Sequence, residues 1–436
     1  MKYKVPSLLS IVAVVALLLI GPTHVLSQSA AGSPSPSLTW DQVKIKFEAA
    51  NPDLKADALG VDEMKAQEIT AFLRPNPTAS FTMDQLYPFG PHYDPNESGT
   101  RYRPLSNALT TGSISYLYER EHKRDLRLLS AKEGTRIAGS QHEDLERNLL
   151  FTLRSAFVDT LQSKAVLELA KADLTYYDRI IQISHDRLRA GDIAQIDLDR
   201  IELLRVQYEV EIQTASVNLR TAKILLLQLL NDRTPVERFD VTGPFDFSDD
   251  LKPLDEFRQT ALDARPDLRA ALEAIQQAQT NRKLAQADGS ADPTFSVDSG
   301  ANPPLDPYVG FNINIPLRIF DRNQGEKQRT QIEISRSEQL TEAARAQVFS
   351  DVDSAYSQLE SNLALLRPYK AQYNAQALRV RDTVTYSYQH GGASLMDFLN
   401  AQSDCRVVQL AYLQLIGSYL TAGGQLNLAV GREVIQ

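Results

Sequence analysis

The sequence RLRAGDIAQIDLDRIELL, from Arg187 to Leu204, decides the fold because a similar sequence returns in the second half of the chain. The second copy is YSYQHGGASLMDFLNAQSD, from Tyr386 to Asp404. In each copy a stretch with helical spacing reaches a glycine, Gly191 or Gly391, and another helical stretch follows. Glycine adopts the left-handed backbone angles that end a helix and turn the chain, at little cost. The two copies therefore predict two helical hairpin tips in one chain.

An aspartate follows each glycine at the same spacing. Asp197 and Asp397 each come six residues after the glycine and precede an apolar residue. This places them near the start of the next helix, where a negative charge is favourable to the helix dipole. The shared spacing predicts an internal repeat rather than two or three unrelated domains.

The composition narrows the class of protein. The 436 residues carry a formal charge of −9, which argues against a nucleic-acid partner. Cys405 is the single cysteine, so a disulfide within the chain is impossible. Residues 1–27 are predicted to be a secretory signal, because two lysines precede an apolar run too short to span a bilayer easily. A retained membrane anchor is the alternative, and residues 28–37 are predicted to be a linker.

The first repeat is predicted to occupy residues 38–245. It should contain, in order, a helix over 38–73, strands at about 77–87 and 111–119, a long helix over 120–190 and a return helix over 192–231. The strands are recognised by alternation of apolar and polar residues, and the helices by their helical spacing and by the prolines that end them.

The second repeat, residues 246–436, follows the same plan. It should contain a helix over 252–288, strands at about 294–299 and 308–315, a long helix over 320–389 and a return helix over 394–430. In each half we expect the two shorter helices to stack end to end beside the long one, so that each half supplies two columns of helix.

The predicted strands have one apolar face and one face of Ser, Thr, Asn and Asp, which is typical of a membrane β-barrel. Four strands cannot close a barrel, because roughly eight is the practical minimum. Several chains must therefore pool their strands, and the strand count alone allows two, three or four chains. A soluble sheet packed on its own helices is the alternative.

Several short motifs, in order and duplicated, resemble the TolC-type outer-membrane efflux channels over nearly the whole chain after the signal. They are Ala49–Leu54 (AANPDL), Arg74–Pro77 (RPNP), Arg189–Gly191 with Asp197, and Gly391 with Asp397–Gln402. The resemblance implies a mainly α protein with a small membrane β part. It implies a homotrimer with a long-helix α-barrel in the periplasm, continuous with a 12-stranded β-barrel in outer-membrane lipid, to which each chain gives four strands. The hairpin tips should meet a periplasmic adaptor and, through it, an inner-membrane pump of the resistance-nodulation-division type.

Three stretches are similar to the branch of this family that serves heavy-metal (cobalt-zinc-cadmium) pumps. They are Tyr118–Arg120 with Lys123–Arg124, Pro316–Gly325, and Leu365–Pro368. The resemblance implies a passive conduit with a slight preference for heavy-metal ions over drugs or secreted proteins. His390–Gly392 (HGG) departs from the family, whose tip carries an apolar or small residue before a single glycine.

Candidate functional residues lie at and above the tips. Those expected to contact the adaptor are Ala190, Gly191, Asp192, His390, Gly391 and Gly392. The resemblance places acidic residues near Asp382, which in a trimer would form an acidic ring at the closed pore entrance; pairing with Arg381 on an exposed face is the alternative. Arg187 and Arg189 are the nearest cationic partners by sequence. Pro368 is a candidate hinge, or a static kink needed for packing.

The sequence shows no sign of an enzyme. It has no glycine-rich phosphate loop, nucleophile elbow or metal-ligand pair, so we expect no catalytic residues, cofactor or metal site. His390 is a potential pH-sensitive contact, although an exposed cap residue is the favoured interpretation. Two other classes stay open: a periplasmic adaptor, which should carry lipoyl-like β segments around one hairpin, and a coiled-coil scaffold, which should show sustained heptads and needs no strands.

Overall fold

The computed structural model describes residues 37–86, 108–301 and 305–435. The expected signal, all of the linker except Ser37, the end of the first predicted strand at Tyr87 and the following loop lie outside these residues. The described part of the chain falls within one structural unit, Ser37–Gln436.

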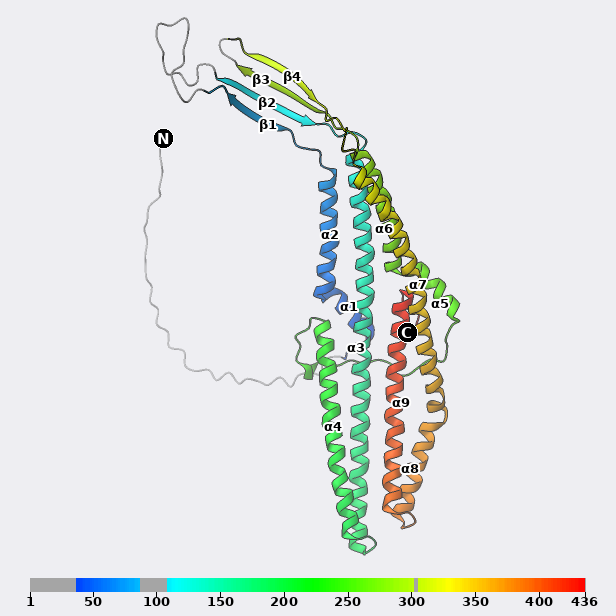
Figure 1. Ribbon diagram of the computed structural model, residues 1–436. Coiled ribbons are helices and arrows are strands. Elements are labelled where there is room, and N and C mark those ends of the chain that lie inside the picture. Colours follow the sequence, from blue (N-terminus) through cyan, green and yellow to red (C-terminus); the bar gives the residue numbers. More distant parts are fainter. Residues whose placement is uncertain (1–36, 87–107, 302–304, 436) are drawn as a thin grey trace, which may run out of the picture. The chain divides into compact units, whose positions relative to one another are not determined.

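The helices and strands follow one another in the same order in both halves (Figure 1). The first half contains α1 (Trp40–Ala50), α2 (Pro52–Phe72), β1 (Thr78–Asp84), β2 (Leu109–Leu117), α3 (Lys123–Ala190), α4 (Gln195–Leu229) and a 3-10 turn (Val236–Arg238). The second contains α5 (Leu254–Ala264), α6 (Pro266–Asp288), β3 (Thr294–Ala301), β4 (Tyr308–Asn314), α7 (Gln324–Pro368), a π-helical turn (Tyr369–Tyr373), α8 (Asn374–Gln389) and α9 (Leu395–Val430).

The single helices predicted over 38–73 and 252–288 are wrong, because each is broken before a proline. Asn51 and Arg265 have extended backbone angles, with ψ of 125° and 122°, and Pro52 and Pro266 each begin a new helix. Proline disfavours helical angles in the residue before it and is well suited to the first helical position. The Asn51 side chain fixes the first break, because it accepts a hydrogen bond from the Leu54 amide at 3.0 Å.

The ends of the other elements also differ from the prediction. α3 starts later than residue 120 because Glu121 and His122 have positive φ, and α7 starts later than residue 320 because Asn323 does. The return helices α4 and α9 start at residues 195 and 395, since the turns before them are longer than expected. β1 ends at Asp84, before Gln85 with φ of 55°, and the other strand ends shift by a few residues.

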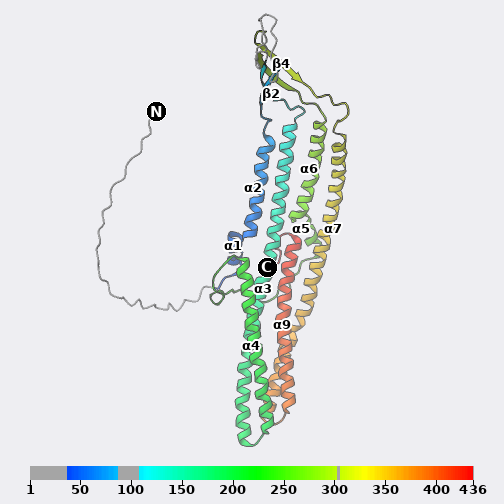
Figure 2. The same cartoon turned by 60° about the vertical axis from the view of Figure 1, so that its left-hand side comes forward.

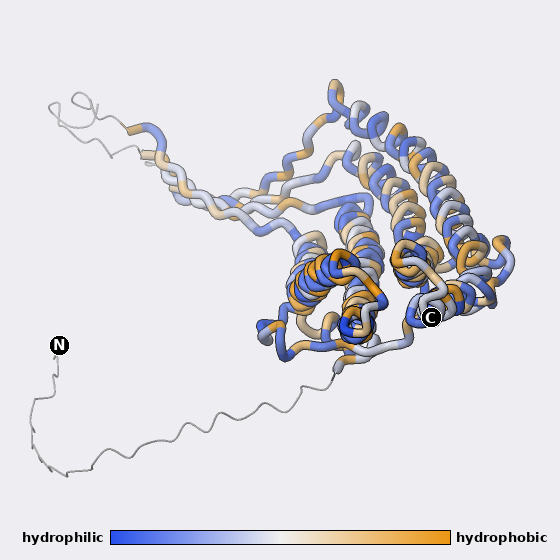
Figure 3. Tube along the Cα trace, turned by 90° about the horizontal axis from the view of Figure 1, so that it is seen from below, coloured by the Kyte–Doolittle hydropathy of each residue, from blue (hydrophilic) through white to orange (hydrophobic). Residues whose placement is uncertain are grey.

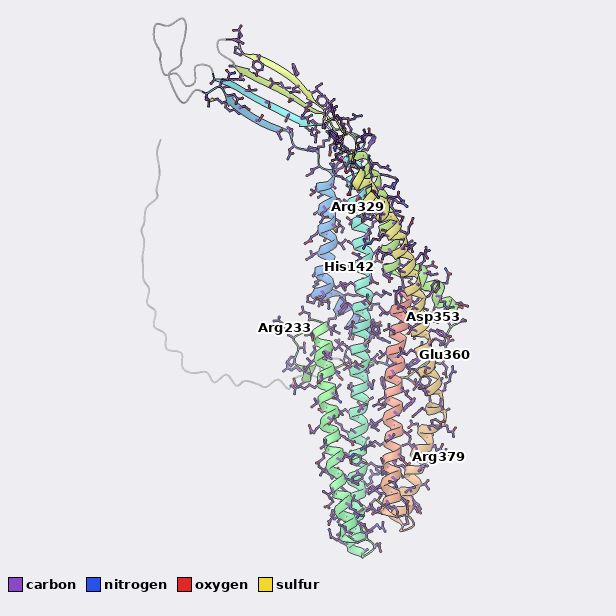
Figure 4. The ribbon with its side chains drawn as sticks, viewed as in Figure 1. His142, Arg233, Arg329, Asp353, Glu360 and Arg379 are labelled. Carbon is purple, nitrogen blue, oxygen red and sulfur yellow. The ribbon has the colours of Figure 1, made fainter. Side chains whose placement is uncertain are left out.

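The two shorter helical segments of each half lie along the long one. α2 and α4 both pack against α3, while α6 and α9 pack against α7, and α9 continues along α8 (Figure 2). The halves are joined because α3 also packs against α6 and α9. Side-chain pairs link these layers: His142 of α3 lies 2.7 Å from Asp57 of α2, and Asp353 of α7 lies 2.8 Å from Arg258 of α5 (Figure 4).

The buried core is divided along the helices rather than gathered in one place. Hydrophobic and hydrophilic residues are interspersed along the helices that can be followed in Figure 3, which fits helices that pack on more than one side. One cluster lies between α5, α7 and α9 around Leu359 and Leu426, and another lies between α1, α3 and α4 around Phe47 and Leu226. The third joins the hairpins near their tips.

The four strands form one antiparallel sheet in the order β1-β2-β3-β4. The register places Ala79, Ile114, Val297 and Phe311 in one row, and the neighbouring row on the other face holds Ser80, Ser113, Asp298 and Gly310. The apolar face is open, with Phe311 83% exposed, whereas hydrogen bonds such as Thr78–Ser115 (2.6 Å) join the polar side chains. β1 and β4 are edge strands in the described part of the chain.

Among the described helices, none combines the length and the apolar character needed to cross a membrane.

Candidate functional site

The first hairpin tip closes at the end of α3. Gly191 has φ of 81°, a left-handed conformation that suits glycine. The amide of Gly191 donates to the Leu188 carbonyl at 3.0 Å, and the amide of Asp192 donates to the Arg187 carbonyl at 2.9 Å. These bonds satisfy the last carbonyls of α3, so the tip is an ordered helix cap.

The second tip closes in the same way. Gly391 has φ of 76°, and the amide of Gly392 donates to the Ser387 carbonyl at 2.8 Å. A Cβ at Gly392 would lie 2.8 Å from the Ser387 hydroxyl, which gives a local reason for the second glycine. His390 is the exposed C-cap residue of α8, with its Nδ1 atom 2.8 Å from the Tyr386 carbonyl.

The helices that leave the tips begin differently. At the start of α9, the Asp397 amide donates to the Ser394 hydroxyl at 3.2 Å, and that hydroxyl donates to the Asp397 carboxylate at 2.7 Å. The Ser394 hydroxyl and the Ser394 backbone amide both donate to the Asp397 carboxylate, which stabilises its charged form and holds the pKa of Asp397 below its usual value. Ala194 stands in the place of Ser394 at the start of α4, and it offers no side-chain cap.

A buried cluster holds the two hairpins against each other just above the tips. Tyr177, Ile180 and Ile201 come from the first hairpin, and Tyr388 and Phe398 from the second. The rings of Tyr388 and Phe398 stack with centroids 4.9 Å apart. The hydroxyls of Tyr177 and Tyr388 are buried without a partner among the described residues, and burial raises the pKa of Tyr177.

The structure does not bring the three predicted pore residues together within one chain. Arg187 donates to the Tyr388 carbonyl at 2.6 Å, and its guanidinium lies 4.9 Å from the centre of the Tyr388 ring. Arg189 pairs with Asp186 on its own helix. Asp382 is 61% exposed and pairs with Arg381 at 2.8 Å, which matches the alternative interpretation of that residue for a single chain.

A polar layer lies above the buried tip cluster. Tyr176 of α3 donates to the Thr385 hydroxyl of α8 at 2.9 Å, and the Arg381 guanidinium lies 4.7 Å from the Tyr176 ring centre. Nearby, burial raises the pKa of Asp173 to about 6, although Arg406 and Arg381 act to lower it. Asp173 was missed as a site residue, yet it precedes Tyr177 and Ile180 at helical spacing, and that pattern indicates a face turned toward the core.

Pro368 ends α7 and is followed by the π-helical turn Tyr369–Tyr373. Proline lacks the amide that would continue the helical bonds and clashes with an earlier carbonyl, so a local widening of the helix is a natural consequence. Residues of other segments contact the π-helical turn: Lys370 pairs with Asp246 at 3.0 Å, and Tyr369 stacks on Tyr412 of α9. The helix is therefore irregular at the predicted hinge, whose movement stays a prediction.

No cluster of three or more His, Cys, Asp or Glu side chains suited to a metal ion occurs in residues 37–86, 108–301 and 305–435.

The sequence of this chain is similar to those of known outer membrane efflux proteins. A family model described as outer membrane efflux protein matches residues 257–432. The cobalt-zinc-cadmium resistance protein CzcC of Cupriavidus metallidurans is 22% identical over 75% of this chain and 78% of its own length. The outer membrane efflux protein BepC of Brucella suis biovar 1 is 24% identical over 67% of this chain and 66% of its own.

Solved structures share the fold along nearly the whole chain. CusC superimposes with a TM-score of 0.74 at 16% identity, covering 92% of this chain and 94% of CusC. The open state of the MtrE outer membrane channel of Neisseria gonorrhoeae gives a TM-score of 0.71 at 17% identity, covering 91% of this chain and 89% of MtrE. With two capped hairpins and a four-stranded sheet, the chain has the fold of these solved structures, and its second half matches the outer membrane efflux protein family.

Proposed function

We propose that three copies of this chain form the outer-membrane channel of a tripartite efflux system, a passive conduit from an inner-membrane pump and a periplasmic adaptor to the cell exterior. The observation that carries the proposal is the position of the two ends of α3. Its first residue, Lys123, follows the sheet closely along the chain, and its last residue, Ala190, is at a hairpin tip. A helix of 68 residues separates these ends by about 100 Å.

The sheet supports a membrane-embedded oligomer. Its apolar face is exposed, and its edge strands leave backbone groups that lipid cannot satisfy. Strands of neighbouring copies would pair with these edges and would turn the apolar faces toward lipid and the polar faces inward. Three copies of the four-stranded sheet supply twelve strands.

An exposed stripe on α4 supports contact between copies in the helical part. It consists of Ile196, Leu203, Val210, Val217 and Ile224, which recur every seven residues and are between 47% and 72% exposed. A strict seven-residue spacing keeps apolar side chains along one side of a supercoiled helix. A neighbouring copy would cover this stripe and complete an α-barrel. The two halves of the chain would act as internal repeats that supply equivalent helices.

The tips are the proposed contact with the adaptor. Ala190, Gly191, Asp192, His390, Gly391 and Gly392 are all exposed in the single chain. The six tips of a trimer would close the periplasmic end, with the second hairpin nearer the axis, Asp382 repeated as an acidic ring and Pro368 as the hinge. A periplasmic adaptor would have one hairpin and a coiled-coil scaffold would not need the sheet, so both alternatives fit the structure less well.

The proposed cargo is heavy-metal ions, from a pump of the resistance-nodulation-division type. The support is the name of the cobalt-zinc-cadmium resistance protein, together with the three stretches of sequence similar to that branch. Deletion of the gene should lower tolerance to zinc, cobalt or cadmium. A loss of drug tolerance with metal tolerance intact would overturn the cargo assignment and would leave the conduit in place.

Cell fractionation tests the conduit itself. The chain should be extracted only by detergent and from the outer-membrane fraction, and it should form ion-conducting channels in planar bilayers. Recovery in the soluble periplasmic fraction would contradict the proposal.

A further inference from the structure

A cleft of about 710 Å³ lies where the two halves of the chain meet, far along the sequence from both tips. Its lining comes from the start of α1, the middle of α3, residues 242–244, the end of α9 and the C-terminal residues 431–435. Clefts of roughly 300–1,000 Å³ are typical of small-molecule sites in proteins. The volume of the cleft therefore permits a small-molecule ligand. The side chains that line the cleft decide the chemical class of that ligand.

One cation in the cleft stands out by its lack of partners. Four cationic side chains line it: Lys44, Arg147, Arg154 and Arg432. Lys44 pairs with Glu433 at 3.1 Å, Arg147 pairs with Asp144, and Arg432 donates to the Thr260 hydroxyl at 3.5 Å. Arg154 makes no hydrogen bond or ion pair to any residue in the described part of the chain.

Arg154 lies beside an aromatic ring, and two carboxylates of the cleft are close enough to act on its charge. The guanidinium lies 4.6 Å from the centre of the Trp40 ring, and the Arg154 side chain is partly buried. Burial lowers the pKa of Arg154, with Glu433 and Asp41 acting in the opposite direction. Glu433 is already engaged by Lys44, so its charge is shared. A desolvated guanidinium that keeps its donors free is a strong partner for an oxyanion, because charge-assisted bonds gain strength where water is excluded.

The other walls define the rest of the ligand. Trp40 and Phe151 provide aromatic surface beside Arg154, and Leu420 and Ile435 provide aliphatic surface from α9 and the C-terminal residues. Gly424 of α9 packs against Arg154 and Phe151, because a Cβ there would be in ordinary contact with Arg154 at 3.5 Å and with Phe151 at 3.6 Å. A small molecule here would meet one cationic group without a partner, several apolar surfaces and the carboxylates of Asp41, Glu143, Glu146 and Glu433.

We propose that this cleft is a binding site for a small organic anion, whose carboxylate, phosphate or sulfonate pairs with Arg154 and whose apolar body lies against Trp40 and Phe151. Such a ligand would contact α1, α3, α9 and the C-terminal residues at once. The proposed binding is additional to the conduit function and does not depend on it.

Trp40 makes the test specific, because it is the only tryptophan in the chain. The probes are anilinonaphthalenesulfonate and phenylnaphthylamine, which share the same rings and differ by the sulfonate. Each is titrated into the purified full-length chain in dodecyl maltoside, and quenching of Trp40 emission is followed, with Trp40→Phe as the blank. We expect saturable quenching and at least tenfold tighter binding of the sulfonate probe, the size of effect typical of a charged hydrogen bond.

Variants test whether the Arg154 side chain causes the tighter binding of the sulfonate probe. Arg154→Met should bring the two probes to equal affinity, and Arg154→Lys should keep part of the difference. Arg379→Met, at an exposed position on α8, should bind as the wild type does (Figure 4). Binding of the neutral probe by Arg154→Met, with unchanged elution on size exclusion, shows that the cleft is intact. An unchanged preference in Arg154→Met, or no saturable quenching in the wild type, would overturn the proposal.

Discussion

The guanidinium of Arg187, at the end of α3, donates a 2.6 Å hydrogen bond to the carbonyl of Tyr388, near the end of α8. The same group lies over the Tyr388 ring, so one side chain joins the two hairpins of a chain by a polar and an aromatic contact. Within a single chain it is a tie between hairpins, whereas the sequence suggested it as a partner for Asp382.

Replacing Arg187 should loosen the tip. Arg187→Ala removes both contacts with Tyr388, so the second hairpin should move outward more readily and the mean conductance in planar bilayers should rise several-fold. Arg189→Ala is the matched control, because the Arg189 side chain is 78% exposed and pairs only with Asp186 on its own helix. Equal conductance changes in the two variants would show that the tie does not restrain the tip.

Asp382→Ala tests the proposed acidic ring. Three carboxylates near a pore axis attract cations and form a selective constriction. Their removal should raise single-channel conductance and weaken block by Zn²⁺ or Co²⁺. The control is Glu360→Ala, at an exposed position on α7 (Figure 4). Asp173 is unsuitable as the control, because the structure places it partly buried between the hairpins. If Asp382→Ala and Glu360→Ala behave alike, the ring does not exist.

Asp173 should make stability depend on pH. Its pKa is raised by burial from 3.8 to about 6, so the folded state binds more protons than the unfolded state between these values. Stability therefore falls as pH rises through this window, and the ionised carboxylate destabilises the fold above it. Asp173→Asn should have a Tm a few degrees above the wild type at pH 7.5, and the difference should shrink toward pH 4.5. A lower Tm for the variant at pH 7.5 would contradict this account of Asp173.

Two substitutions at the first turns of α4 and α9 test whether the two hairpin tips are structurally equivalent. Ser394→Ala removes the side-chain cap of α9 and should cost about 1 kcal/mol, as such caps typically do. Ala194→Ser places a hydroxyl three residues before Asp197, the spacing that Ser394 and Asp397 have, and should stabilise α4 by a similar or smaller amount. Thermal unfolding measures whether Ser394→Ala lowers the Tm and whether Ala194→Ser raises it. A destabilising Ala194→Ser would mean that the two tips are not equivalent at this turn.

The order of helices and strands could be predicted from the sequence because it depends on local patterns. Glycine at a helix end, alternation in β3 and β4, and helical spacing in α3 are all visible without tertiary structure. Proline follows Asn51 and Arg265 and indicates a break at each, whereas the helical spacing on both sides of each proline predicts one continuous helix. Contacts between segments distant in sequence could not be predicted: nothing local shows that Arg187 reaches Tyr388 or that Trp40 lies beside Arg154.

Native mass spectrometry of the complex extracted from outer membranes tests the central claim most directly. The account predicts a single species with three times the mass of the mature chain, because three four-stranded sheets must pair at their edges and the exposed stripe of α4 must be covered by a neighbouring copy. A monomer or a dimer as the dominant species, or the absence of the chain from the outer-membrane extract, would contradict the account.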